Sequence, residues 1–270
     1  LDAGSGFVPM ANELLKEDKN NIHVLFSHYH IDHILGLFLS PITFMHKFNI
    51  TLHGPLENGS GAMEMMQSMM ISPYFPVDVR EVRSHFTYKG VRTPNARVML
   101  IHKDIDHYNL IVKHDEYAPA GKGRFPLNEF LIVRMIHTNH PEKTISYNFE
   151  RNGKKFTFLT DHENCDGLSN TMRNHIKDSN LLIADCQYNR NKYDTASSGY
   201  GHATPDYVVK LAEQCNVKKL GLTHHDPSST DKDIDAIVVE ARNCPSIVKH
   251  GLSTAKLDIF ACADYQEIEI

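Results

Sequence analysis

The run HYHIDH at residues 28–33 constrains this chain more than any other feature of its sequence. It directly follows residues 22–27 (IHVLFS), a short apolar segment of the kind that buried strands use. A loop at the end of a strand can turn neighbouring side chains inward, so this spacing indicates ligands rather than solvated loop residues. Imidazole and carboxylate groups suit zinc, manganese or iron, with zinc the default. The run therefore predicts a metal site that includes four side chains: His28, His30, Asp32 and His33.

Histidine is abundant in the chain as a whole. There are 18 histidines in 270 residues, and several lie in short polar runs directly after strand-like segments, which points towards metal chemistry. The 5 cysteines are different, because their number is odd and no two form a C-x-x-C pair. We predict that they are reduced, mostly buried and not zinc ligands: Cys165, Cys186, Cys215, Cys244 and Cys262.

The length and charge of the chain exclude some classes of protein. A chain of 270 residues can bury one large core, and its size alone permits one domain or two small ones; we expect a single domain over residues 1–270. No apolar run approaches the roughly 18 residues that a membrane-spanning helix needs, and the start lacks the order of a signal peptide, so we expect a cytoplasmic protein with no membrane partner. The formal charge is −5 with dispersed basic residues, which argues against a large nucleic-acid footprint but allows a small phosphate pocket.

Apolar periodicity and turn signals divide the chain into strands and helices. We predict strands at residues 22–27, 50–53, 131–136, 144–150, 155–160, 181–185 and 219–223, and again after residue 247. We predict helices at residues 10–16, 34–39, 57–70, 168–177, 205–215 and 231–242. A strand meander followed by strand-helix alternation indicates an α/β protein whose sheets are covered by helices, a four-layer αββα sandwich.

Two segments stand apart from this pattern. Residues 83–126 are polar and alternate only weakly, and we interpret them as an inserted hairpin region that could form a lid, a dimer contact or a substrate arm. Residues 1–6 (LDAGSG) resemble the end of a strand that runs into a Gly-rich turn. Because a strand at residue 1 needs pairing partners, we expect the first strands of the fold to precede Leu1.

The pattern H-x-H-x-D-H after a strand resembles the signature of the metallo-β-lactamase superfamily. Three later segments resemble further motifs of that family, in the expected order: TNHP at residues 138–141, FLTD at 158–161 and LGLTHHDP at 220–227. The resemblance extends from Asp2 to about Asp235 and implies the metallo-β-lactamase fold.

The resemblance implies two divalent metal ions, with zinc the default and manganese or iron as alternatives. One ion would be bound by His28, His30 and His140, the other by Asp32, His33 and His224, with Asp161 shared between them. His137 competes with His140, and His225 competes with His224. The motif alignment favours His140 and His224 and leaves the other two as supporting residues. Asp2, in the pattern D-x-G-x-G, resembles a family residue that supports the metal loop.

The segment GHATP at residues 201–205 favours one reaction among those that members of the superfamily catalyse. It resembles the H-x-T element of a phosphodiesterase branch that includes tRNase Z and cyclic-nucleotide phosphodiesterases, where the histidine contacts the phosphate and acts as general acid. Thr204 is a good N-cap and Pro205 a good first helical residue, so His202 would lie beside a helix N-terminus, where a phosphate is stabilised. We assign catalytic roles to His202 and Asp32, and expect Asp185 to orient a ligand.

A small phosphodiester such as a cyclic nucleotide is the expected substrate, because the chain is acidic and we identify no projecting arm of the type that grips tRNA. The charge pattern does not exclude a nucleic-acid partner, and it is compatible with a homodimer. One alternative is a carboxylic ester, thioester or lactone hydrolase, which would use the same metals and make His202 incidental. Another is a non-catalytic ligand-binding domain. Such a domain would be expected to have lost some of the metal ligands, whereas every expected ligand type occurs in this sequence.

Overall fold

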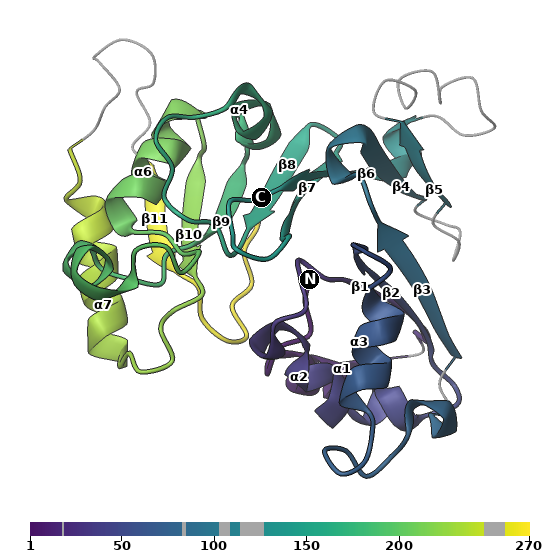
Figure 1. The fold of residues 1–270 in the computed structure, drawn as a ribbon. Coiled ribbons are helices and arrows are strands. Elements are labelled where there is room, and N and C mark those ends of the chain that lie inside the picture. The colour runs from purple at the N-terminus through teal and green to yellow at the C-terminus, as the bar shows by residue number, and fades with distance from the viewer. Residues whose placement is uncertain (18, 83–84, 103–108, 114–126, 246–256) are drawn as a thin grey trace. The chain divides into compact units, whose positions relative to one another are not determined.

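The computed structural model describes residues 1–270 except for residues 18, 83–84, 103–108, 114–126 and 246–256. The chain separates into two compact units, Leu1–Thr93 and Pro94–Ile270 (Figure 1). Each unit has a sheet, helices and a buried apolar cluster of its own. The predicted single domain stays a prediction.

The first unit is built on a parallel sheet in the order β1-β2-β3. Its strands are β1 (Asn21–Leu25), β2 (Asn49–Pro55) and β3 (His85–Val91). Its helices are α1 (Phe7–Leu14), α2 (Ile31–Leu39) and α3 (Ala62–Met69), with 3-10 turns at Pro41–Phe44 and Val79–Glu81. Apolar side chains of these strands and helices share one buried cluster, which fixes α2 against the sheet.

Three boundaries in the first unit differ from the sequence-based predictions. α2 begins at Ile31, because His30 takes an extended conformation as its N-cap (φ −60°, ψ 152°). Asp32 and His33 therefore lie in the first helical turn rather than in the loop that we expected. α3 begins only at Ala62, since a turn with positive φ at Asn58 and Gly59 precedes it. The expected strand at Leu1 is wrong, because residues 1–3 have no strand assignment.

The second unit contains a mixed sheet in the order β11-β10-β9-β8-β7-β6-β4-β5. Its strands are β4 (Arg97–His102), β5 (Asn109–Lys113), β6 (Phe130–His137), β7 (Ile145–Arg151), β8 (Lys154–Leu159), β9 (Leu181–Asp185), β10 (Lys219–Thr223) and β11 (Asp258–Ala261). The strands β8 to β11 run parallel, whereas β6, β7 and β8 form an antiparallel meander. β6 and β8 consequently point in the same direction.

Helices cover the parallel end of this sheet (Figure 1). They are α4 (Asn170–Ile176), α6 (Pro205–Gln214) and α7 (Asp231–Arg242). Alternate strand residues, Leu182 and Ala184 in β9 and Leu220 and Leu222 in β10, are buried in the same apolar cluster as these helices. Shorter elements are α5 (Arg190–Lys192), a π-helical turn at Tyr193–Ser197 and 3-10 turns at Pro94–Ala96 and Leu127–Glu129.

Most predicted elements of the second unit are confirmed. β9, β10 and α7 have the predicted bounds, and Asn152 and Gly153 form the hairpin turn between β7 and β8 with φ values of 50° and 73°. Part of the predicted insertion at residues 83–126 lies outside the described residues. Within the described part, β3 joins the first unit, while β4 and β5 pair antiparallel in the second.

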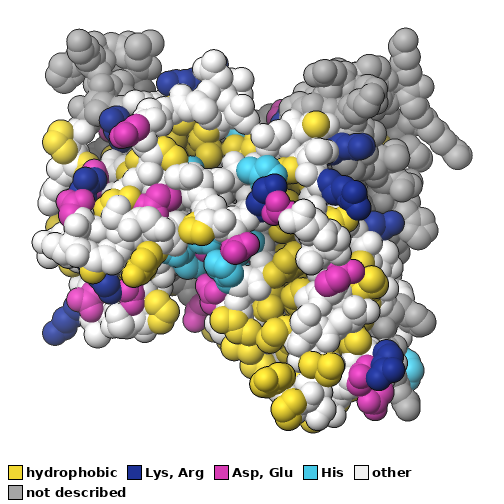
Figure 2. Space-filling view, in the orientation of Figure 1, with side chains coloured by type: hydrophobic (Ala, Val, Ile, Leu, Met, Phe, Trp, Pro, Cys, Tyr) yellow, Lys and Arg dark blue, Asp and Glu magenta, His cyan; other side chains and the backbone are white. Residues whose placement is uncertain are grey.

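Several surface properties also follow from the structure. None of the helices in the described part of the chain is long and apolar enough to cross a membrane. All five cysteines are free thiols; Cys186 and Cys215 are buried and the others are half-buried. The first unit presents an apolar groove of about 740 Å³, where Leu39 and Tyr74 are 59% and 84% exposed (Figure 2). The predicted homodimer stays a prediction.

Candidate metal centre

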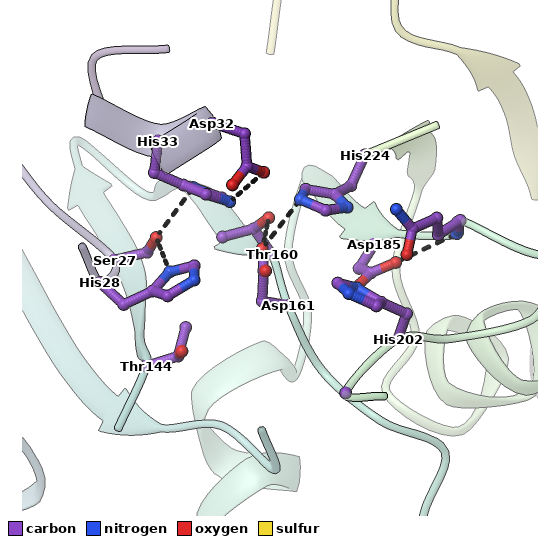
Figure 3. Close-up of polar contacts among 12 residues, drawn as sticks. Ser27, His28, Asp32, His33, Thr144, Thr160, Asp161, Asp185, His202 and His224 are labelled. Atoms are coloured by element: carbon purple, nitrogen blue, oxygen red, sulfur yellow. Dashed lines mark hydrogen bonds and ion pairs between the residues drawn. The ribbon is translucent and has the colours of Figure 1, made fainter. Parts of the chain in front are cut away.

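In the first unit, the predicted ligands are oriented by Asp2 and Ser27; Figure 3 shows the contacts of Ser27 with His28 and His33. His33 donates from Nδ1 to Asp2 Oδ2 over 2.9 Å. The Ser27 hydroxyl donates to the same carboxylate over 2.8 Å, so it accepts from His28 Nδ1 at 3.1 Å. Both imidazoles thus carry their proton on Nδ1 and present Nε2 as a lone pair, which is the form that binds a metal.

The other two ligands of this run lie next to the oriented pair. The Asp32 carboxylate is 3.1 Å from His33 Nε2, and the ring of His30 is centred 4.3 Å from the ring of His28. Gly4 permits this packing, because a Cβ at that position would lie 2.4 Å from the backbone oxygen of Asp32. The first unit therefore brings all four predicted residues of the run together. The support that we expected from Asp2 is a direct bond to His33.

In the second unit, the topology gathers polar residues at one edge of the sheet. β8, β9 and β10 are parallel, so the residues at their carboxyl ends meet at the same edge: Asp161 just after β8, Asp185 at the end of β9 and His224 just after β10. β6 points the same way and leads into the loop of His140. Polar residues at the carboxyl ends of strands are a common way to build a site in α/β folds.

Asp161, His202 and His224 form a compact cluster in this unit. One ligand atom from each lies within 4.8 Å of the others, a separation that a shared metal ion can bridge. His224 Nε2 is 3.5 Å and His140 Nε2 is 4.0 Å from the Asp161 carboxylate. Asp161 and His224 also have positive φ values of 48° and 59°. Such conformations each cost about 1–3 kcal/mol and concentrate at functional sites.

His202 is held by Asp185. Its Nδ1 lies 2.8 Å from Asp185 Oδ2, and its ring stacks on His224 with centroids 4.8 Å apart. Asp185 is 1% exposed, and its other oxygen accepts the Gln187 N–H over 3.1 Å. Asp185 thus orients His202, to which the sequence analysis assigned a catalytic role, while the expected orientation of a metal ligand by Asp185 stays a prediction. Thr204 is the N-cap residue of α6, but its hydroxyl donates to Asp206 Oδ1 instead of accepting a helix N–H.

His140 is fixed by the backbone of Gly201. The Gly201 carbonyl accepts from His140 Nδ1 over 3.1 Å, which leaves the lone pair on Nε2. Gly201 has φ of +96°, and a Cβ there would lie only 2.0 Å from His140 Nδ1. Only glycine therefore allows the two loops to approach so closely. His28, His33 and His140 each present the Nε2 lone pair of the imidazole, and this is the kind of ligand that a divalent metal ion binds.

Sequence reasoning missed two residues that follow Asp161. His162 accepts the Asn139 N–H on Nδ1 over 3.1 Å and contacts the Tyr207 hydroxyl through Nε2 at 2.9 Å. Burial lowers the pKa of His162 to about 4. Glu163 accepts the Gly201 N–H over 2.5 Å and also bonds the Tyr193 hydroxyl. Two further titratable residues directly after a predicted ligand at a strand end were the signal that could have revealed them.

The histidines that competed for ligand roles have other surroundings. His137 lies at the end of β6 with Nδ1 3.4 Å from the Thr144 carbonyl. His225 is half-buried, and its pKa is lowered by burial and by the neighbouring His224. His140 and His224, by contrast, both face Asp161.

Comparison with known proteins supports the same family. The beta-lactamase superfamily domain matches residues 116–225. Ribonuclease Z from Oceanobacillus iheyensis is 24% identical over 237 residues, which cover 81% of this chain and 76% of that protein. The short form of human tRNase Z superposes with a TM-score of 0.53 at 20% identity, covering 84% of this chain and 81% of that one. A diphosphatase of the PhnP family superposes with a TM-score of 0.58 at 15% identity, covering 100% of this chain and 78% of that one.

These matches and the fold define the class: a metal-dependent hydrolase with the metallo-β-lactamase fold. The chain resembles members of the metallo-β-lactamase superfamily, among them Ribonuclease Z and a diphosphatase of the PhnP family. The fold class that we predicted from the sequence is thereby confirmed. The roles of the individual ligands remain predictions.

Proposed function

We propose that the protein is a dinuclear metal phosphodiesterase that acts on a small phosphodiester such as a cyclic nucleotide. The observation that carries the proposal is the placement of His202, which is oriented by Asp185 and lies beside Asp161 and His224. A histidine in this position can protonate a leaving alkoxide. A thioester hydrolase would have less use for it, since a departing thiolate needs less protonation than an alkoxide.

The proposed ligands are the seven residues predicted from the motifs. Four come from the first unit and three from the second: His28, His30, Asp32 and His33, and His140, Asp161 and His224. Two divalent ions bound by such a set supply Lewis acidity and lower the pKa of water towards neutrality. Zinc is the metal that we expect first, because the set consists of imidazoles and carboxylates.

His202 and Asp32 are the residues to which we assign catalytic roles. The Asp185 carboxylate fixes the ring of His202 through Nδ1, which leaves Nε2 as the atom that would give a proton to the departing oxygen. Asp32 is exposed in the first turn of α2, where its carboxylate can accept a hydrogen bond from the attacking water. In this proposal Asp32 assists the attacking water and His202 the departing oxygen.

The choice of a small phosphodiester as the substrate is a separate step of the proposal. The formal charge of −5 supports a small phosphodiester over a long polyanion. Ribonuclease activity is the second candidate, because the curated relative is named Ribonuclease Z. A nucleic-acid partner therefore has to be tested alongside the small substrates.

Metal analysis with a substrate panel tests the proposal. The panel contains bis-(4-nitrophenyl) phosphate, cyclic nucleotides, a precursor tRNA, a lactone and a thioester. We expect two metal ions per chain and turnover of phosphodiesters, with a cyclic nucleotide preferred to RNA. Metal-loaded protein that hydrolyses only the lactone or thioester would overturn the phosphodiesterase proposal.

Paired variants test the ligand assignment. His140→Ala and His224→Ala should each lower the metal content, whereas His137→Ala and His225→Ala should retain it. The pairs are matched, because the two histidines of each pair lie within three residues of one another in the sequence. Loss of metal in the two control variants and retention in the other two would reverse the assignment.

A further inference from the structure

His162 is a buried histidine beside the candidate metal centre that has no part in the proposed chemistry. It directly follows Asp161, and only 3% of the residue is exposed. Burial of an imidazole is unfavourable unless its ring nitrogens form hydrogen bonds. Both nitrogens of His162 do so, one with the backbone of Asn139 and the other with a side chain of α6. His162 therefore links two segments of the second unit.

The two bonds of the His162 ring have a defined direction. The backbone N–H of Asn139 can only donate, so His162 Nδ1 accepts it over 3.1 Å. A neutral imidazole that accepts on Nδ1 carries its proton on Nε2, which donates to the Tyr207 hydroxyl over 2.9 Å. Tyr207 lies in the first turn of α6. The ring thus connects the residue before His140 to this helix.

The backbone around Asp161 is held by bonds that do not involve the His162 ring. Thr138 Oγ1 donates to the Asp161 carbonyl over 2.8 Å. The backbone N–H of His162 donates to Asp185 Oδ2 over 3.3 Å, whichever side chain residue 162 carries. Replacement of the ring should therefore leave Asp161 in place and act on the loop of His140.

The two histidines that face Asp161 approach different oxygens of its carboxylate. His140 Nε2 is 4.0 Å from Asp161 Oδ2, whereas His224 Nε2 is 3.5 Å from Oδ1. Ligands of two separate ions would be arranged in this way. The His162 ring bonds the residue next to His140, and neither of its two partners adjoins His224 in the sequence. Its effect should therefore differ between the two ions.

We propose that His162 is a positioning residue for one of the two metal ions, because it holds the loop of His140 where His140 Nε2 can bind the ion beside Asp161. The proposal rests on the proposed two-metal function, and it adds a residue that sets the affinity of one ion without affecting the ion at His224. His162 itself binds no metal, since both ring nitrogens have other partners. Loss of such a supporting bond typically lowers metal affinity by about 10- to 100-fold.

Two one-ion proteins test the two sites separately. His224→Ala should retain the ion at His140, and His140→Ala should retain the ion at His224. Added to His224→Ala, His162→Phe should weaken zinc binding by about 10- to 100-fold, as measured by competition with a chelating dye. Added to His140→Ala, the same replacement should leave zinc affinity unchanged. A general loss of structure would instead weaken both proteins equally.

Two conservative variants test the bonds themselves. His162→Asn places its Oδ1 near the position of the imidazole Nδ1, so it can still accept the Asn139 N–H. It should recover most of the zinc affinity that His162→Phe loses in the His224→Ala protein. Tyr207→Phe removes only the hydroxyl and should weaken zinc binding there roughly threefold to tenfold, the effect of one hydrogen bond.

His175→Phe is the matched control. His175 is also buried in the second unit, and it bonds the Ser146 hydroxyl over 3.0 Å. Its replacement should lower the melting temperature but leave the zinc affinity of both one-ion proteins unchanged.

Equal weakening of both one-ion proteins by His162→Phe, or no recovery with His162→Asn, would overturn the inference. If His162→Phe does not fold, Tyr207→Phe provides the same comparison, and an equal effect on the two proteins would again overturn it. Failure of both one-ion proteins to bind zinc would instead contradict the two-metal proposal, and the inference would fall with it.

Discussion

His202 Nδ1 lies 2.8 Å from the Asp185 carboxylate, and Asp185 is almost fully buried. Burial strengthens this interaction, because the carboxylate is screened little by water. The bond sets the orientation of the imidazole. A general acid requires a fixed orientation towards the departing oxygen, so this pair gives the most direct test of the proposed chemistry.

Replacement of His202 by Ala should reduce turnover of a cyclic nucleotide by roughly 10²- to 10⁴-fold, the usual size of a general-acid contribution. The metal content should not change, which atomic absorption can verify. The loss should be smaller for 4-nitrophenyl esters, because their leaving group needs little protonation. Full activity of His202→Ala on the cyclic nucleotide would move the protein to the ester or lactone class.

Asp185→Asn should act in the same direction by a different route. The amide can still accept a hydrogen bond from His202 Nδ1, but the bond is no longer assisted by a carboxylate charge and holds the ring less firmly. We expect kcat on a cyclic nucleotide to fall by roughly tenfold, less than in His202→Ala, while the metal content stays the same. An unchanged kcat would show that Asp185 does not position His202.

Asp2→Asn should weaken metal binding by about 10- to 100-fold, because Asp2 orients His33 through its Nδ1. The measurement is a competition titration with a chelating dye. Glu13→Gln provides a control, since Glu13 pairs with Lys16 on the exposed surface of the same unit. Equal affinities for the two variants would contradict the orienting role.

Glu163 should act as a positioning residue, because its carboxylate binds the Gly201 N–H and the Tyr193 hydroxyl. Glu163→Ala would release the loop that fixes His140 and carries His202, and a displacement of about 1 Å can cost roughly 10²-fold in kcat. Glu163→Gln retains an oxygen acceptor and should recover most of the activity. If Glu163→Gln were as inactive as Glu163→Ala, the negative charge rather than the geometry would be the essential property.

Local sequence signals predicted the elements that carry the site. The apolar run before His28 and the hairpin turn at Asn152 and Gly153 both act over a few residues, so periodicity and turn chemistry identify them. The family resemblance then supplied the order of the motifs. The convergence of Asp161, Asp185 and His224 could be anticipated from parallel strands that end at one edge.

The contacts that lock the site could not be predicted, because they join segments distant in sequence. The Glu163 bond to Gly201 spans 38 residues, and the His162 bond to Asn139 spans 23. No local pattern specifies such pairs. The start of α2 at Ile31 was missed for another reason: His30 is a weak N-cap type, and its extended backbone rather than its side chain begins the helix.

The last prediction concerns stability at low pH. His53 in β2 is 1% exposed, and burial, together with the charges of His23 and Lys89, lowers its pKa from 6.5 to about 3. As the pH falls below 6.5, the unfolded state therefore binds a proton that the folded state does not. The free energy of unfolding should then decrease by about 1.4 kcal/mol per pH unit between pH 6.5 and about 3 from this residue, with no effect above pH 6.5.

His53→Leu should remove that part of the pH dependence, whereas His46→Leu, at an exposed position of the same unit, should retain it. Urea unfolding of the metal-free protein in EDTA, followed by circular dichroism at pH 7.5, 6.0 and 5.0, measures the difference without a contribution from metal release. Subtracting the free energy of unfolding of each variant from that of the wild type at every pH gives the contribution of the histidine that was replaced, so His53 can be compared with His46. A difference that does not change with pH would mean that His53 is charged as easily in the folded protein as in the unfolded chain.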